Sequence, residues 1–477
     1  MHSKTSLRHK CQTTCLLVMA LLTAASSAQA ALTISGGATK NVSCASGVCS
    51  ATAATAVLNK NDLETMLASS NVRVVPGSVA TNIVIDTGVT WASGYGLTLD
   101  AYQSIAFDEP VTVNGTGAFT ILTNDGGSGG DYTFGPKGKV TFLSTSNALT
   151  INGTAFTLLG SMSDVQAINT NLNGNYALAN SYNAKHVTGW TPIGTGAPGF
   201  AGMFEGLGNT ISNLNVNIGT GNDAGLFGNS TGTIRDIGIV GGAVIGGQDV
   251  GGLVGANGGT IVHSYSTASV GGNSSWPVGG LVGTLGGSEG VAIRDSYASG
   301  AVAGRKQVGG LVGEMYGAAT IDECFATGTV TSSEQSGPGT GGLVGYQNDS
   351  DISVIENSYA TGAVPGTTDY RGGLVGQNKT DNVAIVSSYS TGAVNNSGSD
   401  VGGFVGANSS HASNDYWDTT SSGMTNGCNG NLCSGITGLT TAQFQSGLPA
   451  GFDPTIWAEN LSINNGFPYL INNPPPQ

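Results

Sequence analysis

The sequence has little charge: Asp, Glu, Lys and Arg together make up 9% of its 477 residues. Helical proteins carry many of these residues on their surfaces, so a mainly helical fold is not expected. Basic residues are especially scarce, with 15 Lys and Arg against 29 Asp and Glu and a net charge of −14. This excess of negative charge repels nucleic acid and anionic lipid, and we expect neither as a partner. After the first thirty residues no apolar run approaches the roughly 20 residues of a membrane span, so no transmembrane segment is predicted.

Side chains suited to catalysis or metal binding are also few. Beyond residue 30 the His residues are His186, His263 and His411, which are far apart and in no metal-binding spacing. No G-x-S-x-G occurs with a plausible acid and base in support. A β-helix polysaccharide-degrading enzyme needs clustered carboxylates, and the nearest groups, Asp108–Glu109 and Asp349–Asp351, look like turn residues. We therefore predict no catalytic residue, no cofactor and no metal ligand, and interpret the chain as a non-enzyme.

The sequence does contain glycine and regularly spaced apolar residues. Glycine fills 78 positions and 39% of the chain is hydrophobic, which argues against disorder. Between Ile83 and Leu158, three-residue segments such as Leu97–Leu99 carry apolar residues first and third, with Thr between them. In a strand these residues point to opposite faces, so we expect a train of short β-strands. Strands this short favour a parallel β-helix, and residues 31–160 are predicted to form an N-terminal β-helical stem.

A six-residue phrase, most often Val-Gly-Gly-Leu-Val-Gly, recurs through the second half of the chain. Its central apolar residues lie 27 to 32 residues apart, a period typical of solenoids whose repeats are too small to bury a core alone. The sequence thus predicts an all-β, right-handed parallel β-helix, with a lead-in segment at 161–220 and the repeat solenoid at 221–410. The predicted structural repeat positions are Leu226, Leu253, Leu281, Leu311, Leu343, Leu374 and Phe404.

Each phrase is followed by a second repeated segment. Residues Ser358–Gly362 read Ser-Tyr-Ala-Thr-Gly, and close copies recur in the other repeats. Stacked coils place equivalent residues about 4.8 Å apart, so Tyr over Tyr is expected to form a ladder along the rod. Cys324 occupies a slot that Ser holds elsewhere. We interpret it as a small buried ladder residue; a reactive thiol is the alternative.

The N-terminus has the pattern of a secretory signal peptide at residues 1–30. Lys4, Arg8 and Lys10 are basic, Cys15–Ala25 is a short apolar run, and Ala28–Ala30 offers a small-residue cleavage site. Removal of this segment would change the net charge from −14 to −17. We therefore expect export, to the extracellular space or the cell surface, with the periplasm also open.

Four cysteines of the expected mature chain form two close pairs. Cys44 and Cys49 lie near one end, and Cys428 and Cys433 near the other. In an oxidising compartment close pairs in glycine-rich segments form local disulfides, which we predict here. A metal site is the alternative, although no His or further Cys stands near to complete four ligands.

The repeats end near Asn414–Asp418, and aromatic residues gather in the tail that follows. Phe444, Phe452 and Trp457 belong to this tail, which extends to a terminal run of prolines. A solenoid must cover its open end, so residues 411–477 are predicted to form a C-terminal cap and tail.

The two repeated segments together resemble the GLUG motif of bacterial surface proteins. Residues 174–178, 189–194 and 202–211 look like the lead-in that precedes such motifs, and Tyr416–Asp418 looks like part of the usual tail. This resemblance covers roughly residues 160 to 470. The segment Leu97–Leu158 is similar to the β-helical stems of filamentous-haemagglutinin-like proteins, although the Asn-Pro-Asn motifs of their secretion domain are missing.

The resemblance implies a secreted or surface-displayed bacterial protein of adhesin type. We expect it to bind an extracellular glycan or protein of a host, a matrix or a neighbouring cell, with self-association possible. GLUG motifs also occur in some IgA-peptidase-like proteins, so the resemblance leaves an extracellular enzyme on a β-helix open, either polysaccharide-degrading or peptidase-associated. A passive structural or biofilm matrix protein is the remaining alternative.

Overall fold

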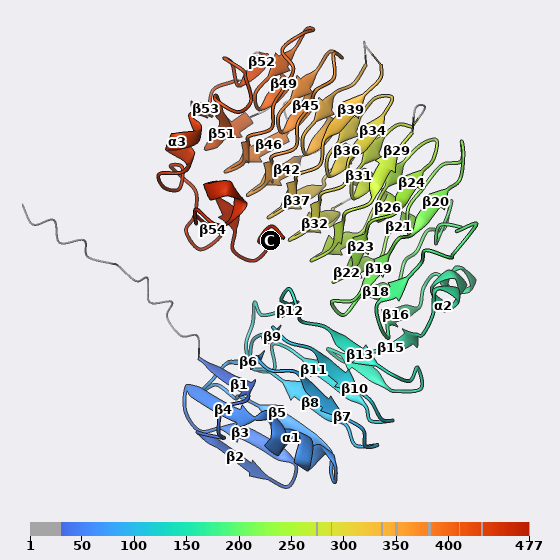
Figure 1. The fold of residues 1–477 in the computed structure, drawn as a ribbon, viewed down its shortest axis with the longest axis vertical. Coiled ribbons are helices and arrows are strands. Elements are labelled where there is room, and N and C mark those ends of the chain that lie inside the picture. The colour runs from blue at the N-terminus through green and yellow to red at the C-terminus, as the bar shows by residue number, and fades with distance from the viewer. Residues whose placement is uncertain are drawn as a thin grey trace, which may run out of the picture.

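The computed structural model describes residues 30–272, 275–287, 289–334, 337–348, 352–379, 383–409, 411–430 and 433–476. Together these residues form a parallel β-solenoid, whose coils stack from the N-terminal to the C-terminal part of the chain (Figure 1). The predicted all-β solenoid is therefore confirmed. The expected signal peptide, except Ala30, and the Asp349–Asp351 pair lie outside the described residues. Within the described part, no helix is long and apolar enough to cross a membrane.

The stem is built from the predicted short strands. Val111 and Val113 point inward and are fully buried, and Thr112 between them pairs in register with Thr90 and Thr141 of the neighbouring coils. One stem sheet contains β12 (Tyr132–Phe134), β9 (Ile105–Phe107), β6 (Asn82–Ile85), β1 (Ala31–Ser35) and β4 (Thr55–Asn59), and another contains β13 (Val140–Phe142), β10 (Val111–Val113) and β7 (Val89–Trp91).

A third sheet, of sixteen strands, runs through both the stem and the repeats. Its strands, in spatial order, are β2 (Val42–Ala45), β3 (Val48–Ala51), β5 (Val72–Val75), β8 (Leu97–Asp100), β11 (Phe119–Leu122), β14 (Leu149–Ile151), β15 (Thr154–Leu159), β16 (Asn175–Leu178), β18 (Met203–Glu205), β22 (Thr233–Arg235), β27 (Thr260–Val262), β32 (Ala292–Arg294), β37 (Thr320–Asp322), β42 (Ser353–Glu356), β46 (Val383–Val386) and β50 (His411–Ser413).

The strand direction reverses between the stem and the repeats. Strands β14 and β15 pair antiparallel as a hairpin, while their outer neighbours β11 and β16 pair parallel to them. The hairpin turn is Asn152-Gly153, and both residues have positive φ, 47° and 81°. Asn-Gly favours this turn because both residues tolerate the left-handed conformation. The expectation that the strands near Leu149 and Phe156 are successive β-helix strands is thus wrong.

Each repeat forms one coil of short strands: the coils that begin at Val250, Val278 and Val308 contain five, and those that begin at Thr340 and Arg371 contain four in the described part of the chain. One such coil runs through β30 (Val278–Gly279), β31 (Val282–Gly287), β32, β33 (Tyr297–Ala298) and β34 (Val302–Gly304) before the next begins at β35 (Val308–Gly309). Each strand pairs in parallel with its equivalent one repeat away, so the repeat in sequence becomes a stack in space.

The remaining strands extend these stacks. The phrase supplies a six-stranded sheet of β25 (Val250–Gly251), β30, β35, β40 (Thr340–Gly341), β44 (Arg371–Gly372) and β48 (Val401–Gly402), and an eight-stranded sheet of β21 (Phe227–Ser230), β26 (Val254–Asn257), β31, β36 (Val312–Gly317), β41 (Val344–Gln347), β45 (Val375–Asn378), β49 (Val405–Asn408) and β52 (Cys428–Gly430). The second segment supplies a ten-stranded sheet of β17 (Tyr182–Asn183), β19 (Thr210–Ser212), β23 (Gly238–Val240), β28 (Tyr265–Ser266), β33, β38 (Phe325–Ala326), β43 (Tyr359–Ala360), β47 (Tyr389–Ser390), β51 (Asp415–Asp418) and β53 (Ile436–Leu439), and a five-stranded sheet of β20 (Asn215–Asn217), β24 (Ala243–Ile245), β29 (Ser269–Gly271), β34 and β39 (Val330–Ser332).

The paired glycines of the phrase allow the backbone to approach itself closely. A Cβ on Gly309 would lie 1.9 Å from the carbonyl oxygen of Val312, and a Cβ on Gly310 would lie 2.0 Å from that of Gly342 in the next coil. Neither glycine has a positive φ. The requirement for glycine here is therefore steric contact between backbones, not a left-handed conformation.

The two ends of the solenoid are closed differently. At the N-terminal end, helix α1 (Lys60–Leu67) buries Leu63 and Leu67 against the first coils. At the other end, Trp417 of β51 (Asp415–Asp418) pairs in register with Ser390 of the coil below. Its ring lies against Gly403 and covers the interior of the last coil. The tail contains α3 (Thr441–Phe444), β54 (Trp457–Ala458) and β55 (Tyr469–Leu470), and α3 contacts β53 at this end. The tail folds back along the side of the coils (Figure 1). Helix α2 (Met162–Ala167) lies in the lead-in.

Candidate binding surface

The predicted repeat positions form the inner wall of the solenoid. All seven side chains have no solvent exposure: Leu226, Leu253, Leu281, Leu311, Leu343, Leu374 and Phe404. Their backbone carbonyls accept hydrogen bonds from the next lower coil, as between Leu311 N and Leu343 O at 2.9 Å. These residues hold the scaffold together, so a ligand must be bound elsewhere.

The slot that contains Cys324 is a ladder of hydrogen bonds. Ser358 donates its hydroxyl to the carbonyl of Glu356 at 2.6 Å and accepts the backbone N–H of Cys324, one coil below, at 3.2 Å. Cys324 is fully buried, and its thiol contacts the carbonyl of Asp322 in the equivalent geometry. Burial raises the pKa of the Cys324 thiol well above its usual value. Burial and a raised pKa both disfavour a reactive thiolate, and the contacts of Cys324 fit the interpretation of a ladder residue.

The aromatic side chains of the second segment form a continuous stack. Neighbouring ring centroids are 4.7 to 5.0 Å apart and the planes differ by 2° to 7°. The stacked residues are Tyr265, Tyr297, Phe325, Tyr359 and Tyr389, here called the aromatic ladder.

The C-terminal tail covers most of the aromatic ladder. The Tyr389 hydroxyl donates to the carbonyl of Pro468 at 2.6 Å, and Trp457 packs 5.7 Å from the Tyr389 ring. Farther along, the Asn473 amide donates to the carbonyls of Glu323 at 2.9 Å and Ser296 at 3.3 Å. The tail thus takes up the apolar outer face of the ladder from Phe325 to Tyr389, whereas Tyr265 and Tyr297 stay half-buried.

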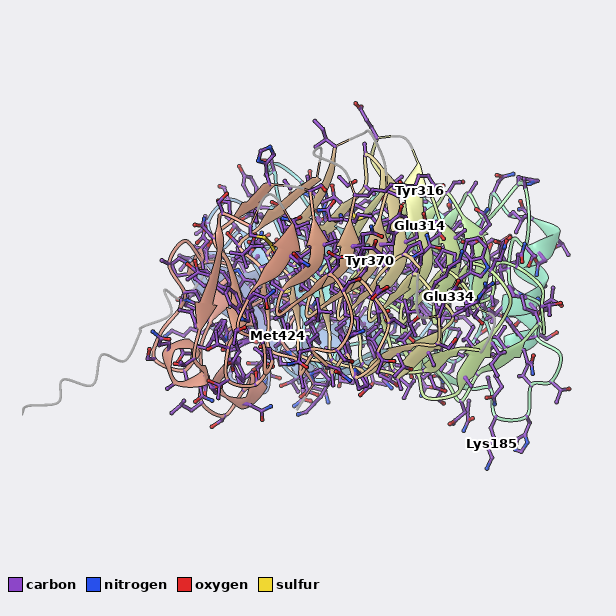
Figure 2. All side chains as sticks on the ribbon, turned by 90° about the horizontal axis from the view of Figure 1, so that it is seen from above. Lys185, Glu314, Tyr316, Glu334, Tyr370 and Met424 are labelled. Carbon is purple, nitrogen blue, oxygen red and sulfur yellow. A yellow bond between two sulfur atoms is a disulfide. The ribbon has the colours of Figure 1, made fainter. Side chains whose placement is uncertain are left out.

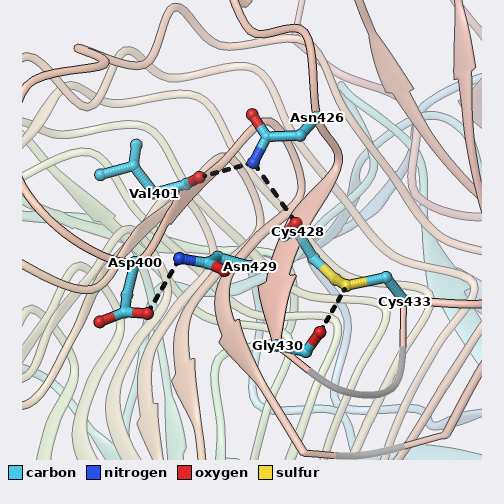
Figure 3. Close-up of a disulfide and its surroundings, with 7 residues drawn as sticks. All are labelled: Asp400, Val401, Asn426, Cys428, Asn429, Gly430 and Cys433. Atoms are coloured by element: carbon cyan, nitrogen blue, oxygen red, sulfur yellow. Dashed lines mark hydrogen bonds between the residues drawn. A yellow bond between two sulfur atoms is a disulfide. The ribbon is translucent and has the colours of Figure 1, made fainter.

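Both predicted cysteine pairs are joined as disulfides. Cys44–Cys49 links the two strands of the β2–β3 hairpin in the stem. Cys428–Cys433 closes a loop after β52, next to the Asn429 amide that donates to Asp400 at 3.0 Å (Figure 3). Each disulfide constrains a turn near one end of the solenoid.

Charged side chains gather where the stem meets the repeats. This junction cluster consists of Tyr132, Glu205, Arg235, Asp236 and His263. The Tyr132 hydroxyl donates to Glu205 Oε2 at 2.6 Å, and Arg235 Nε donates to Asp236 Oδ2 at 2.6 Å. The Arg235 guanidinium lies 3.9 Å from the centre of the Tyr132 ring, and His263 Nδ1 lies 3.5 Å from Asp236 Oδ1. Strand β12 of the stem is thereby joined to three successive coils of the repeats.

Burial separates the proton affinities of the two carboxyl groups in this cluster. Burial, reinforced by the charge of Asp236, raises the pKa of Glu205 well above its usual value. Burial also acts to raise the pKa of Asp236, but Arg235 and His263 outweigh it and the pKa is lowered. Burial opposes protonation of His263, yet Asp236 raises its pKa overall. Glu205 thus holds a proton more tightly than Asp236, and two neighbouring carboxyl groups whose pKa values are pushed apart are the electrostatic pattern of an acid–base pair.

The carboxylates of the junction cluster are bound by groups of the protein itself. Glu205 accepts from Tyr132 and from the backbone N–H of Leu207, and Asp236 is engaged by Arg235 and His263. Both carboxylates are about 1% exposed, so substrate contact would require the joint to open. The sequence does not indicate this cluster, because Tyr132 and Glu205 are 73 residues apart and belong to no repeat. The arrangement is best suited to fastening the stem to the repeats.

The loops before each phrase form an edge that varies in length and in burial. We call it the loop edge and define it as residues 246–249, 275–277, 305–307, 333–334, 337–339, 365–370 and 395–400. On the opposite corner, where the long sheet ends, one residue turns the chain in each coil, with φ of 47° at Asp295 and 46° at Asn357. The loop edge instead ranges in length from three residues at 305–307 to seven between Ser332 and Thr340. The length of the connections between strands thus varies mainly on this edge, as in proteins that bind through loops on a rigid scaffold.

Aromatic and basic side chains occur together on the loop edge. Lys306 Nζ lies 4.0 Å above the ring of half-buried Trp276, and Arg305 Nε pairs with Glu334 Oε2 at 2.7 Å. Figure 2 labels Glu334 and Tyr370 along this edge. Trp, Tyr and Arg are the residue types enriched where proteins bind partners. In the part of the chain that the structure describes, no group of three or more His, Cys, Asp or Glu side chains is arranged to hold a metal ion.

Comparison with known families and proteins locates the GLUG motif on these coils. The GLUG motif matches residues 304–331 and 336–364, which include part of the loop edge and two aromatic-ladder residues. Halomucin of Haloquadratum walsbyi is 33% identical over 274 residues, which cover 53% of this chain. The alignment covers 3% of Halomucin, so this chain spans only a small fraction of that protein's length.

Two solved structures share part of the fold. A Bacteroides ovatus protein described as a proposed immunoglobulin A1 protease is 19% identical, with a TM-score of 0.47, over 67% of this chain and 93% of that one. A structure described as IgA1 protease is 22% identical, with a TM-score of 0.32, over 54% of this chain and 21% of that one. The GLUG match and the stacked strands of this structure together describe a β-solenoid repeat protein that carries the GLUG motif.

Proposed function

We propose that this protein is a non-enzymatic, secreted or surface-displayed adhesin-like protein that binds through its loop edge. The observation that carries the proposal is the placement of Trp276, Lys306, Arg305 and Tyr370 on one variable edge of an otherwise regular solenoid. Their chemistry suits an extracellular glycan or protein, because aromatic faces pack against sugar rings or side chains while Arg and Lys donate hydrogen bonds.

Repetition strengthens such binding. Equivalent loops recur on successive coils, so a polymeric ligand or a dense cell surface meets several weak sites at once. Avidity of this kind raises modest affinities by roughly 10² to 10⁴. Secretion or surface display is supported by the signal-like N-terminal sequence, by two disulfides and by the GLUG motif.

A binding array with glycans and matrix proteins tests the proposal. The full chain is compared with the double variant W276A/Y370A, and with Y95A as a matched control. Tyr95 is 42% exposed on the stem, so its removal changes the same kind of surface away from the loop edge. We expect the double variant to lose at least tenfold in affinity for a captured ligand, and Y95A to retain it. Equal binding by all three proteins would contradict a role for the loop edge.

The enzyme alternative makes a different prediction. If the junction cluster performed acid–base catalysis, the protein would release reducing sugar or cleave peptide substrates, and E205Q would abolish that activity. We expect neither activity in the wild-type protein, because both carboxylates of the cluster are already bound within it. Glu205 accepts a hydrogen bond from Tyr132, and Asp236 accepts one from Arg235. Turnover that depends on Glu205 would replace the adhesin proposal with a hydrolytic one.

A further inference from the structure

Arg371 is a buried guanidinium within the loop edge region. It occupies the first position of the phrase, where Val308 and Val401 stand in other coils, and pairs in register with Thr340 below it. The side chain has no solvent exposure, because the loop of residues 395–400 lies over it. A charged residue thus replaces an aliphatic one at a fully buried ladder position.

The guanidinium of Arg371 is only partly satisfied by the protein. Nη2 donates to the carbonyls of Asn395, at 2.7 Å, and Ser397, whereas Nε and Nη1 have no hydrogen-bond partner. Among the described residues no carboxylate lies within ion-pairing distance of Arg371. The nearest acid, Asp369, instead accepts the backbone N–H of Ser399 at 2.9 Å. Asp369 acts on Arg371 through its charge without pairing with it, so the buried guanidinium is compensated only in part.

Further hydrogen-bond donors surround the same space. The hydroxyls of Thr340 and Thr368 are 3.5 Å apart, and both side chains are buried. Gly366 leaves room beside them, since a Cβ there would lie 3.9 Å from Thr368 Oγ1 and 4.0 Å from Arg371 Cδ. A Cβ on Gly398 would lie 3.1 Å from the carbonyl oxygen of Thr368 and 3.4 Å from both Arg371 Nη1 and Asp369 Oδ1. Two unpaired N–H donors of Arg371 thus lie in the same region as the linked hydroxyls of Thr340 and Thr368, with the Asp369 carboxylate at its edge.

We propose that Arg371, Thr340 and Thr368 form a binding site for a tetrahedral oxyanion, sulfate or phosphate, under the loop of residues 395–400. A guanidinium with two free N–H groups matches two oxygens of such an anion, and the hydroxyls complete its shell. The loop must move to admit the ion, which would break the hydrogen bonds from Arg371 to the Ser397 carbonyl, from the Ser399 N–H to Asp369 and from the Tyr370 N–H to the Ser399 carbonyl. The oxyanion is either a free ion or an ester group on a glycan. This inference goes beyond the proposed adhesion and does not depend on it, because ion binding and attachment are measured separately.

Thermal unfolding of the full chain at constant ionic strength tests the site. Sulfate stabilises many proteins by exclusion from their surfaces, so the informative signal is a saturable rise in Tm above the response to chloride. We expect the wild-type protein to show a saturable rise of a few degrees, and R371V, which restores the ladder valine, to show only the general salt response. The control R305V removes an exposed arginine of the loop edge and should keep the saturable rise.

Identical sulfate and phosphate responses of wild type and R371V would overturn the inference. If R371V does not fold, T368A provides the test, with an apparent affinity expected to fall about tenfold. An unchanged affinity in T368A would count against the site. A sulfated disaccharide and its unsulfated counterpart distinguish the sources of the oxyanion. A shift with the sulfated sugar that needs Arg371 indicates an ester ligand, and a shift with inorganic ions alone indicates a free ion.

Discussion

Asp415 accepts the backbone N–H of Ser388 at 2.9 Å, in the place where the coils below use a serine hydroxyl or the Cys324 thiol. Its other carboxylate oxygen accepts the N–H of Ser413 at 3.0 Å. A carboxylate thus ends the serine ladder at the last full coil. Burial nevertheless raises the pKa of Asp415 from 3.8 to about 8.

The raised pKa of Asp415 predicts a pH-dependent stability. Because the folded protein binds this proton more tightly than the unfolded chain, raising the pH from about 4 to about 8 removes stability. D415S should restore the hydroxyl ladder and stabilise the protein by on the order of 2 kcal/mol at pH 8, with little gain at pH 4. Unfolding by denaturant across this pH range measures the difference. A gain that does not change with pH would show that Asp415 is ionised without penalty.

The tail should depend on the aromatic ladder. Y389A removes a fully buried ring, its stack on Tyr359 and its bond to Pro468, and should destabilise the protein by about 3–5 kcal/mol. The tail should then become the first site of limited proteolysis, detectable by mass spectrometry. Y389F, which loses only the hydroxyl, should cost about 1 kcal/mol. Equal protease resistance of Y389A and the wild type would mean that the tail is held by other contacts.

Cys324 should be replaceable by Ser without loss. C324S restores the residue found at the equivalent positions 296 and 358, and we expect its free energy of unfolding to stay within about 1 kcal/mol of wild type. In the folded protein the Cys324 thiol should not react with a thiol-specific reagent such as DTNB, whereas denatured protein should react fully. Rapid reaction of the native thiol would favour the alternative of a reactive cysteine.

The junction cluster should be needed for the joint between stem and repeats. R235M leaves Glu205 and Asp236 buried without their cation and should destabilise the protein by about 3–5 kcal/mol near neutral pH. Since Arg235 lowers the pKa of Asp236, its contribution is present above the ordinary value of 3.8 and is lost as the pH falls further. R305M breaks an exposed pair and should cost less than about 1 kcal/mol. Similar losses in both variants would argue against a special role for the junction.

Features that repeat with the coil could be predicted from the sequence. The positions of Leu311 and Cys324 followed from comparing one repeat with the next, since stacking converts sequence period into spatial contact. The reversal at Asn152-Gly153 also has a local signal in the sequence, because Asn-Gly favours a hairpin turn. The regular spacing of the short strands predicts a continuous series instead and hides this signal.

The sequence by itself therefore determined the stacked β-coils, their inner leucine wall and the serine slot of Cys324. Only the tertiary structure decided which distant groups meet. Tyr132 and Glu205 are 73 residues apart, Asn473 and Ser296 are 177 apart, and Asn395, whose loop covers Arg371, lies 24 residues further along the chain. These contacts recur in no other repeat, so no sequence period reports them. They depend on how the chain reverses, docks its tail and closes its loops, which are properties of packing rather than of local pattern.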